Sequence, residues 1–392
     1  MDYLPLRILH VVESLDRGGL ERMVVDLAME QSRRGHQVTV ATLYRPGPLA
    51  AELHQTSVNT ANCNKTTLGH LQAACALRRQ LARGIDVMHS HNPMSHYYSI
   101  ATGFGLPRIV RINTRHGMGP NASDSRRMEW LYARSLKHTD AVAVVCEAAR
   151  QHFLARNVPI PERWITLRNG IDLSRVEERS DAHRRALLAE LKRPSSSCII
   201  GCVGRLNPVK QHQVLIETFA RIVPKNPDAC LVIVGDGSER SHLIDLAAQH
   251  GITESVYFLG TRNDVPSLLA GMDIFALTSA SEGYSLALVE ASAAGLPIIA
   301  SDVGGNSEIV TDGVTGKIFP PGDIDYCANQ LQELAASSVL RERMGTKARS
   351  WALEHASLQT MATAYEMLYR GARTLTPGGK PHSTQSDLEP TT

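Results

Sequence analysis

The chain has 392 residues, 43% hydrophobic and 20% charged, which is typical of a soluble globular protein with two or three domains. No run reaches the roughly 18 apolar residues of a membrane-spanning helix. The seven cysteines include no Cys-x2-Cys pair, which argues against a zinc site and a disulfide framework and favours buried thiols in a reducing cytoplasm.

The net charge of +2 hides an asymmetry between the two halves of the chain. Residues 1–177 carry 22 Lys and Arg against 15 Asp and Glu, whereas the remainder carries 19 against 24. A basic first half allows peripheral contact with an anionic membrane or an acidic acceptor, although a solvated surface is the more common reason. No basic stripe has interleaved aromatic side chains, so we expect no nucleic-acid binding. We expect a cytoplasmic protein, with the inner face of the membrane as the alternative location.

Strand-like and helix-like segments alternate along the first half. The expected strands are short runs rich in Val and Ile, and the first reads as a buried strand rather than a signal peptide. They span residues 7–13, 37–43, 86–91, 108–113 and 141–146. Residues 19–35 place apolar side chains at the spacing of a helix face. This alternation indicates a parallel sheet that is covered by helices on both faces.

The loop after the first expected strand carries Gly18 and Gly19. Paired glycines before a helix let the backbone approach a ligand closely and direct N–H groups at an anion, but a tight turn also needs glycine. The fingerprint Gly-x-Gly-x-x-Gly is absent, which argues against a nicotinamide-dependent Rossmann enzyme.

Three histidines lie at or after the ends of expected strands. His116 follows the strand 108–113, where it can hydrogen-bond a sugar or transfer a proton. His89 and His91 have no carboxylate partner and make a poor metal site, so we interpret them as cleft-lining polar residues or as structural residues.

The segment 126–137 mixes cations with Trp130 and Tyr132. Such a segment can touch a membrane that carries a lipid-linked acceptor. An ordinary surface helix explains the same pattern and is the more common case.

The first series of elements ends in residues 169–197, whose polar composition and Pro/Ser cluster suit a linker. We place the boundary between an N-terminal domain, 1–177, and a second domain, 178–354. A second series of expected strands follows at 198–203, 229–234, 256–259, 273–278 and 297–300. Two such series imply two doubly wound domains. The tail 377–392 is rich in Gly, Pro, Ser and Thr, and we expect it to be disordered.

The first loop of the second half carries two cations after Gly204. Arg205 and Lys210 flank the start of an expected helix, where cations are electrostatically disfavoured. An anionic ligand explains them better than two solvated charges do. A diphosphate, whose charge grows as a glycosidic bond breaks, is such a ligand.

Two glutamates eight residues apart follow the strand 273–278. Glu282 is expected in a strand-to-helix loop and Glu290 about two turns into the helix, so the carboxylates can lie on the same side. The residues between them begin with Gly283, Tyr284, Ser285 and Leu286. The N–H groups of this helix start offer an anion site. Carboxylates for sugar and ribose hydroxyls, with N–H groups for phosphate, are what a sugar-nucleotide donor needs.

Taken together, these segments resemble the retaining nucleotide-sugar glycosyltransferases of family 4, which have the GT-B fold. The resemblance spans nearly the whole chain and is most specific in the second half. Its motifs are Gly18-Gly19, Gly-Arg-Leu…Lys at 204–210, Val-Gly-Asp-Gly-x-Glu at 234–239, Glu-x7-Glu at 282–290 and Gly-Gly-x-x-Glu at 304–308. It implies an N-terminal acceptor-binding domain and a C-terminal donor-binding domain that face a central cleft. The last helix, 355–374, would cross back to the N-terminal domain.

The resemblance also implies roles for individual residues. It implies catalytic roles for His116, Arg205, Lys210 and Glu282. It implies donor contacts for Gly18, Gly19, Gly204, Gly283, Tyr284, Ser285, Leu286 and Glu290. In the family, the two cations hold the diphosphate, the first glutamate contacts the donor sugar and the second the ribose. The family often has Glu-Gly-Phe-Gly where this chain has Glu-Gly-Tyr-Ser, which leaves the approach of the sugar to Ser285 open.

The implied activity moves a hexosyl unit, with retention, from a UDP- or GDP-sugar to a glycan or lipid-linked acceptor. The opening motif also resembles transferases of bacterial exopolysaccharide assembly. Front-side attack requires only that the protein stabilise the leaving group and orient the acceptor, so we expect no metal and no cofactor. The alternatives are a nucleotide-sugar epimerase of the same architecture and a non-catalytic nucleotide-sugar-binding protein.

Overall fold

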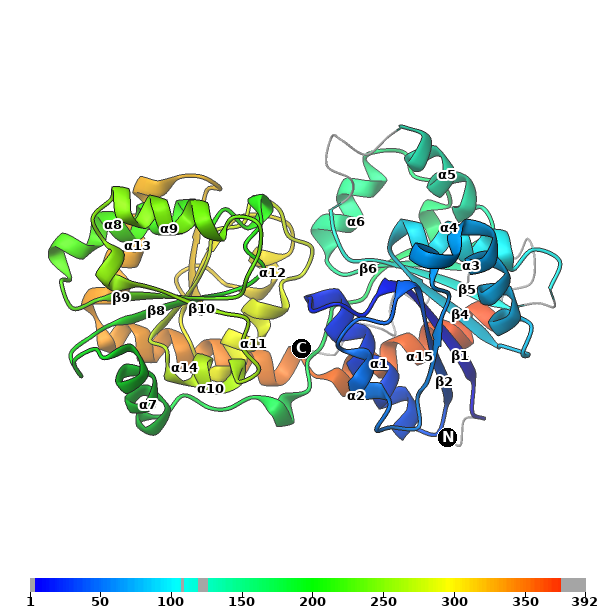
Figure 1. Cartoon of the computed structure of the whole chain (residues 1–392), viewed down its shortest axis with the longest axis horizontal. Helices are drawn as coiled ribbons and strands as arrows, with labels where there is room; N and C mark the ends of the chain where they lie inside the picture. Colours follow the sequence, from blue (N-terminus) through cyan, green and yellow to red (C-terminus); the bar gives the residue numbers. More distant parts are fainter. Residues whose placement is uncertain (1–3, 107–108, 119–125, 375–392) are drawn as a thin grey trace.

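The protein folds into two lobes, each a parallel sheet with helices on both faces (Figure 1). The computed structural model describes residues 4–106, 109–118 and 126–374. The tail 377–392 lies outside the described residues. The two sheets confirm the predicted α/β class with two Rossmann-like units.

The N-terminal lobe contains a seven-stranded sheet in the order β3-β2-β1-β4-β5-β6-β7. The strands are β1 (Arg7–Ser14), β2 (Gln37–Arg45), β3 (Asn59–Asn62), β4 (Val87–His91), β5 (Val110–Arg115), β6 (Ala141–Val144) and β7 (Trp164–Thr166). The helices are α1 (Gly19–Arg33), α2 (Ala50–Leu53), α3 (Lys65–Leu81), α4 (Asn92–Thr102), α5 (Arg126–Leu136), α6 (Glu147–Leu154) and, from the end of the chain, α15 (Leu358–Thr374). Consecutive buried side chains of the central strands point to opposite faces of the sheet. One face packs against α1 and α15, and the other packs against α3 and α4.

The C-terminal lobe contains a six-stranded sheet in the order β10-β9-β8-β11-β12-β13. The strands are β8 (Ile199–Val203), β9 (Cys230–Val234), β10 (Val256–Gly260), β11 (Ile274–Leu277), β12 (Ile298–Ser301) and β13 (Gly316–Phe319). The helices are α7 (Asp181–Leu191), α8 (His212–Ile222), α9 (Arg240–Gln249), α10 (Val265–Gly271), α11 (Leu286–Ala294), α12 (Asn306–Ile309), α13 (Ile324–Ala336) and α14 (Ser338–His355). In both sheets the strand order reverses beside the first strand, and ligands of such sheets bind outside the carboxyl ends at this point.

Two crossing segments connect the lobes, the first at residues 167–180 between β7 and α7 and the second at residues 356–357 between α14 and α15, and they run side by side where they cross. The main-chain nitrogen of Ile171 donates to the carbonyl of Ala356 at 2.9 Å, and that of Leu358 donates to the carbonyl of Ile171 at 2.9 Å. Gly170 permits this approach, because a Cβ there would lie 2.4 Å from the carbonyl oxygen of Ser357. The second segment leads into α15, which packs on α1 and β5, so the predicted return of the last helix is confirmed.

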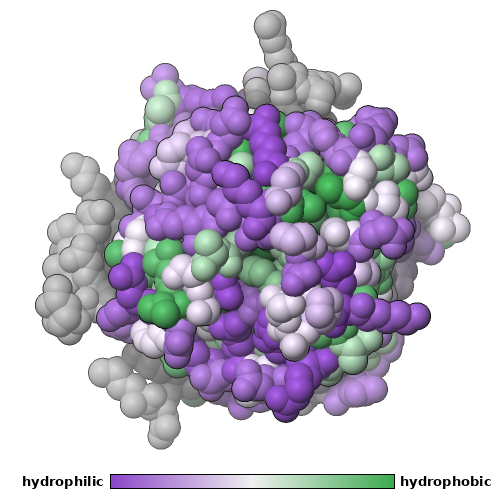
Figure 2. All heavy atoms as spheres, turned by 90° about the vertical axis from the view of Figure 1, so that its left-hand side faces the viewer, coloured by the Kyte–Doolittle hydropathy of each residue, from purple (hydrophilic) through white to green (hydrophobic). Residues whose placement is uncertain are grey.

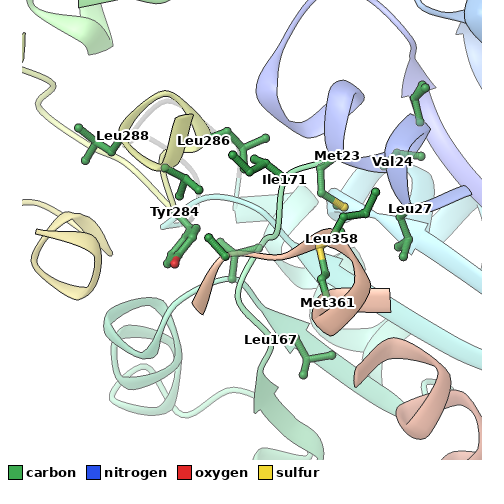
Figure 3. Close-up of a cluster of buried hydrophobic side chains, with 14 of the residues drawn as sticks. Met23, Val24, Leu27, Leu167, Ile171, Tyr284, Leu286, Leu288, Leu358 and Met361 are labelled. Atoms are coloured by element: carbon green, nitrogen blue, oxygen red, sulfur yellow. The ribbon is translucent and has the colours of Figure 1, made fainter. Parts of the chain in front are cut away.

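Apolar side chains fill the junction between the crossing segments and the two lobes (Figure 3). Those labelled in the figure come from α1, the first crossing segment, the start of α11 with its preceding loop, and α15: Met23, Val24, Leu27, Leu167, Ile171, Tyr284, Leu286, Leu288, Leu358 and Met361. This packing holds α15 on the N-terminal lobe. It also brings the start of α1 opposite the start of α11.

The segment 126–137, considered above for membrane contact, forms α5 and the turn after it. Tyr132 is buried, and its hydroxyl donates to Oδ1 of Asn113 at 2.6 Å, so it belongs to the core and does not face a membrane. Figure 2 shows a mainly hydrophilic outer end of the C-terminal lobe. Among the described helices, none combines the length and apolarity needed to cross a bilayer.

Candidate active site

A cleft of about 940 Å³ lies between the two lobes. The residues for which the resemblance implies catalytic or donor-binding roles all line it: Gly18, Gly19, His116, Gly204, Arg205, Lys210, Glu282, Gly283, Tyr284, Ser285, Leu286 and Glu290. They come from loops at the carboxyl ends of β1, β5, β8 and β11 and from the first turns of α11. The parallel sheets of the two lobes thus present their ligand-binding edges to one another.

Lys210 and Glu282 form an ion pair in the wall of the C-terminal lobe. Nζ of Lys210 lies 2.6 Å from Oε1 of Glu282, and the hydroxyl of Ser279 donates to the same oxygen at 2.6 Å. The Glu282 side chain is 10% exposed, so little water competes with these contacts. The pair places one cation and one carboxylate at fixed positions beside the cleft.

Backbone contacts hold the two loops that carry this pair. The main-chain nitrogen of Ala280 donates to the carbonyl of Val209 at 2.8 Å, and the hydroxyl of Thr278 donates to that of Gln211 at 2.9 Å. Lys210 ends a 3₁₀ turn whose first residue follows Asn207, and the Asn207 side chain accepts a hydrogen bond from the Lys210 nitrogen at 3.2 Å. These hydrogen bonds hold the main chain at Lys210, and they therefore fix the position from which its side chain extends to Glu282.

Arg205 is exposed in the cleft, and within the described residues it has no ion pair shorter than 4 Å. A Cβ built on Gly18 would lie 3.5 Å from its guanidinium and 2.3 Å from Oε2 of Glu21. The glycine loop of the N-terminal lobe thus faces this arginine closely. A phosphate placed between them would meet both a cation and the N–H groups at the start of α1.

Gly283 lies where the lobes touch. A Cβ there would lie 2.0 Å from the carbonyl oxygen of His116, so any side chain would separate the two loops. Gly304 has φ +55°, and a Cβ on it would lie 1.9 Å from the carbonyl oxygen of Glu282. The nitrogen of Gly305 donates to the carbonyl of Gly283 at 2.8 Å, so this Gly-Gly pair supports the glutamate loop.

His116 follows the end of β5, and its main-chain nitrogen donates to Oδ1 of Asn92 at 3.2 Å. Burial, with a further contribution from Arg115, lowers the pKa of His116 to about 3. Its imidazole is therefore neutral at physiological pH, and it can take part in hydrogen bonds but carries no positive charge.

Glu290 lies partly buried on α11 and faces α1 of the other lobe. Burial, and to a lesser extent the nearby carboxylate of Asp26, raises its pKa to about 7, while Arg22 acts in the opposite direction. Asp26 is itself held by Arg22 at 2.7 Å and by Arg175 at 3.1 Å. The Glu290 carboxyl therefore changes its charge near neutral pH.

Comparison with known proteins identifies the family. A profile described as Glycosyltransferase Family 4 matches residues 17–175, and one described as Glycosyl transferases group 1 matches residues 183–351. The GDP-mannose-dependent alpha-(1-6)-phosphatidylinositol monomannoside mannosyltransferase of Mycolicibacterium smegmatis is 31% identical over 296 residues, which are 72% of this chain and 75% of that protein. The chain belongs to glycosyltransferase family 4.

Other similar proteins agree with this membership. The N-acetyl-alpha-D-glucosaminyl L-malate synthase of Bacillus anthracis is 28% identical over 364 residues, which are 90% of this chain and 93% of that protein. The crystal structure of Anabaena HepE with UDP-glucose has a TM-score of 0.83 and 23% identity, and the match covers 93% of this chain and 100% of that one. The family 4 chain thus has the GT-B fold, and it is an enzyme that transfers glycosyl groups from nucleotide sugars.

Several residues that line the cleft of this family 4 transferase were not predicted from the sequence. They are charged or polar side chains on α1 and the loop before it, at the start of α4, on the first crossing segment and on the loop after β10: Arg17, Arg22, Asp26, Asn92, Asn169, Asp172, Arg175 and Arg262. Their local sequences have no motif, and only the meeting of the two lobes brings them to the cleft. Arg17 alone had a signal, since it adjoins Gly18.

His89 and His91 do not line the cleft, so the cleft-lining interpretation is wrong. Both are fully buried on β4, and with His10 of β1 they form a cluster whose candidate ligand atoms lie within 4.8 Å of one another. Every ring nitrogen of the three already has a protein partner. His89, for example, contacts the Tyr369 hydroxyl at 2.7 Å and that of Thr114 at 2.7 Å. This donor set fits a hydrogen-bond network better than a metal centre.

Residues 323–325 form an Asp-x-Asp sequence, whose two carboxylates could hold a metal ion. Neither aspartate lines the cleft, and both have structural partners. Asp323 caps α13 by accepting a hydrogen bond from the Tyr326 nitrogen at 2.9 Å. Asp325 pairs with Arg221.

Proposed function

We propose that this transferase moves a hexosyl unit from a UDP- or GDP-sugar to a glycan or lipid-linked acceptor, with retention of configuration. The observation that supports this most is the Lys210–Glu282 pair at 2.6 Å with Arg205 on the same wall, because it combines a diphosphate site with a sugar-binding carboxylate.

Relatives support both parts of the proposal. An Escherichia coli relative, 28% identical over 267 residues, is the UDP-Gal:alpha-D-GlcNAc-diphosphoundecaprenol alpha-1,3-galactosyltransferase. The M. smegmatis relative uses GDP-mannose. Both have lipid-linked acceptors in their names, which supports a role in exopolysaccharide or cell-surface glycan assembly.

In the proposed reaction the bond between the anomeric carbon and the diphosphate oxygen breaks, and the acceptor oxygen bonds to the same face of that carbon. The acceptor proton passes to the departing diphosphate. Lys210 and Arg205 neutralise the negative charge that develops on the leaving group. Glu282 holds the sugar in position for the attack of the acceptor oxygen.

We propose that these two cations take the place of a metal ion. We expect transfer in about 5 mM EDTA, which is a large excess of chelator over trace metal, to proceed at the rate of the untreated enzyme. Initial rates before and after dialysis against chelator test this. A loss of activity that Mg²⁺ or Mn²⁺ restores would contradict it.

The donor site is tested by thermal unfolding with UDP, GDP, ADP and NADH. A ligand at about 100 times its dissociation constant stabilises the folded state by roughly 2.7 kcal/mol. We expect this shift with one nucleoside diphosphate and its loss in Glu290→Ala. A shift with NADH alone, or with none of the four, contradicts the proposal. Conversion of the donor without any acceptor would instead favour an epimerase.

A further inference from the structure

A chain of hydrogen-bonded side chains leads from the core of the N-terminal lobe to the cleft. Oε1 of Gln31, on α1, lies 2.8 Å from Nε2 of His10. Nδ1 of His10 lies 3.1 Å from Nε2 of His91, and Nδ1 of His91 lies 3.1 Å from Nε2 of His116. The first three residues are fully buried, and His116 lines the cleft.

The strand order creates this chain. β1 and β4 are neighbours in the sheet, with His10 paired to His89, so His10 and His91 project from the same face toward α1 and α15. Gln31 reaches His10 from α1, and His116 follows the next strand, β5.

The direction of every hydrogen bond in the chain follows from its first member. An amide oxygen can only accept, so Nε2 of His10 carries its proton. A neutral imidazole has one N–H, so Nδ1 of His10 accepts from Nε2–H of His91. By the same rule, Nδ1 of His91 accepts from Nε2–H of His116.

The imidazoles must be neutral for this rule to hold. Burial lowers the pKa of His10 to about 4 and that of His116 to about 3. Burial also lowers the pKa of His91 well below its usual value. All three are therefore neutral at the pH of the cell.

The orientation of the Gln31 amide sets this direction. Its Nε2 donates to the Tyr369 hydroxyl at 3.3 Å, and its Oε1 faces His10. That hydroxyl lies 2.7 Å from Nδ1 of His89. The tautomer of His116 therefore reports the orientation of this amide as well.

One atom is left over at the cleft end of the chain. Nδ1 of His116 has no hydrogen-bond partner among the described residues. A lone pair there repels phosphate oxygens, which are acceptors as well, and attracts a hydroxyl or amide hydrogen. Of the parts of a sugar nucleotide, this excludes the diphosphate and leaves the hydroxyl groups. The ribose hydroxyls are assigned to Glu290, so a hydroxyl of the transferred sugar remains.

We propose that Gln31, His10 and His91 are positioning residues that hold His116 as the Nε2–H tautomer, so that its Nδ1 accepts a hydrogen bond from a hydroxyl of the bound sugar. The ligand half of this inference rests on the proposed function. The tautomer half concerns the free protein and does not.

Nitrogen NMR of the full-length protein with ¹⁵N-labelled histidine tests the tautomer directly, because two-bond ¹⁵N–¹H couplings distinguish the protonated nitrogen. The His116 signals are assigned from their absence in His116→Gln. We expect Nε2–H at His116 in the wild type. A mixture of tautomers is expected in Gln31→Met, which removes the accepting oxygen at similar size. Gln332→Met is the matched control, since it makes the same substitution on α13 of the other lobe and removes an amide oxygen that accepts from Nδ2 of Asn226 at 2.8 Å, away from the cleft.

In transfer assays we expect Gln31→Met to lower kcat/KM about fivefold, the effect of one weakened hydrogen bond, and Gln332→Met to leave it unchanged. An Nδ1–H or a charged imidazole at His116 in the wild type overturns the proposal, as does a wild-type tautomer in Gln31→Met. If Gln31→Met fails to fold, the wild-type spectrum decides. The spectrum needs no ligand, so a failure of the proposed function leaves this result separate.

Discussion

Lys210→Met is expected to lower kcat by about two to three orders of magnitude while the protein stays folded. The methionine keeps the length of the side chain but removes the ammonium that lies 2.6 Å from Glu282 and lines the proposed diphosphate site. In the wild type, the ammonium stabilises the transition state, in which the diphosphate departs, more than it stabilises the bound donor. Its loss should therefore lower kcat by a larger factor than it raises KM. Glu282→Ala should be equally inactive, because it removes both the sugar contact and the partner of Lys210. Initial rates at saturating donor give the result.

Lys317→Met is the matched control. Nζ of Lys317 lies 3.0 Å from Oε2 of Glu333, and its side chain is 17% exposed, so it loses a similar ion pair in the same lobe. It does not line the cleft. We expect its rate to stay within about twofold of the wild type, because a partly exposed pair contributes little to stability. Wild-type turnover in Lys210→Met or Glu282→Ala would refute the assigned site.

The strands that the sequence reveals are the ones that carry buried aliphatic runs, such as β1 and β9, which lie in the middle of their sheets. Three others escaped. β3 reads Asn-Thr-Ala-Asn and lies at the sheet edge with mostly exposed side chains, so it has no hydrophobic pattern. β7 has only three residues, too few to show a period, and β13 reads Gly-Lys-Ile-Phe, which has no aliphatic run like those of the predicted strands.

The candidate site could be predicted where a motif follows a strand, because the carboxyl end of a parallel strand already implies a place at the cleft. Arg205, Lys210 and Glu282 could be predicted in this way. Asp26 and Arg175 could not, since Asp26 lies in the middle of α1 and Arg175 in the first crossing segment. Their approach to α11 depends on how the lobes meet.

The histidine chain shows the same limit inside one lobe. His10 and His91 are 81 residues apart in the sequence, and only the crossover that places β4 beside β1 brings them to 3.1 Å. A histidine in a strand of unknown neighbours can be structural or functional. The order of the strands decides between the two.

Glu290→Gln is expected to weaken nucleotide binding by about 10- to 100-fold at pH 8, the effect of losing charge-assisted hydrogen bonds to the ribose hydroxyls. The wild-type carboxyl, whose pKa is about 7 in the free protein, accepts these hydroxyls best when ionised. Donor affinity of the wild type should therefore rise with pH through 7, and binding near pH 7 should release a proton. Titration calorimetry in buffers of different ionisation enthalpy measures both effects. Equal affinity of the two proteins at pH 8 would contradict the ribose contact.

The same carboxyl links the stability of the free protein to pH. Its folded pKa of about 7 lies above the usual 4.5, so the protonated form is favoured in the folded state. The stability it contributes is complete below pH 4.5 and is lost as the pH rises through 7, since only the unfolded chain ionises readily between these values. Glu290→Gln lacks this loss. Its free energy of unfolding relative to wild type should therefore increase by roughly 2 to 3 kcal/mol between pH 4 and pH 8. Denaturant titrations at the two values measure it, and near pH 4 both side chains are neutral, so the pair is its own control. A variant whose relative stability does not change with pH would show that Glu290 is ionised in the free cleft, and its role in binding would then need no proton release.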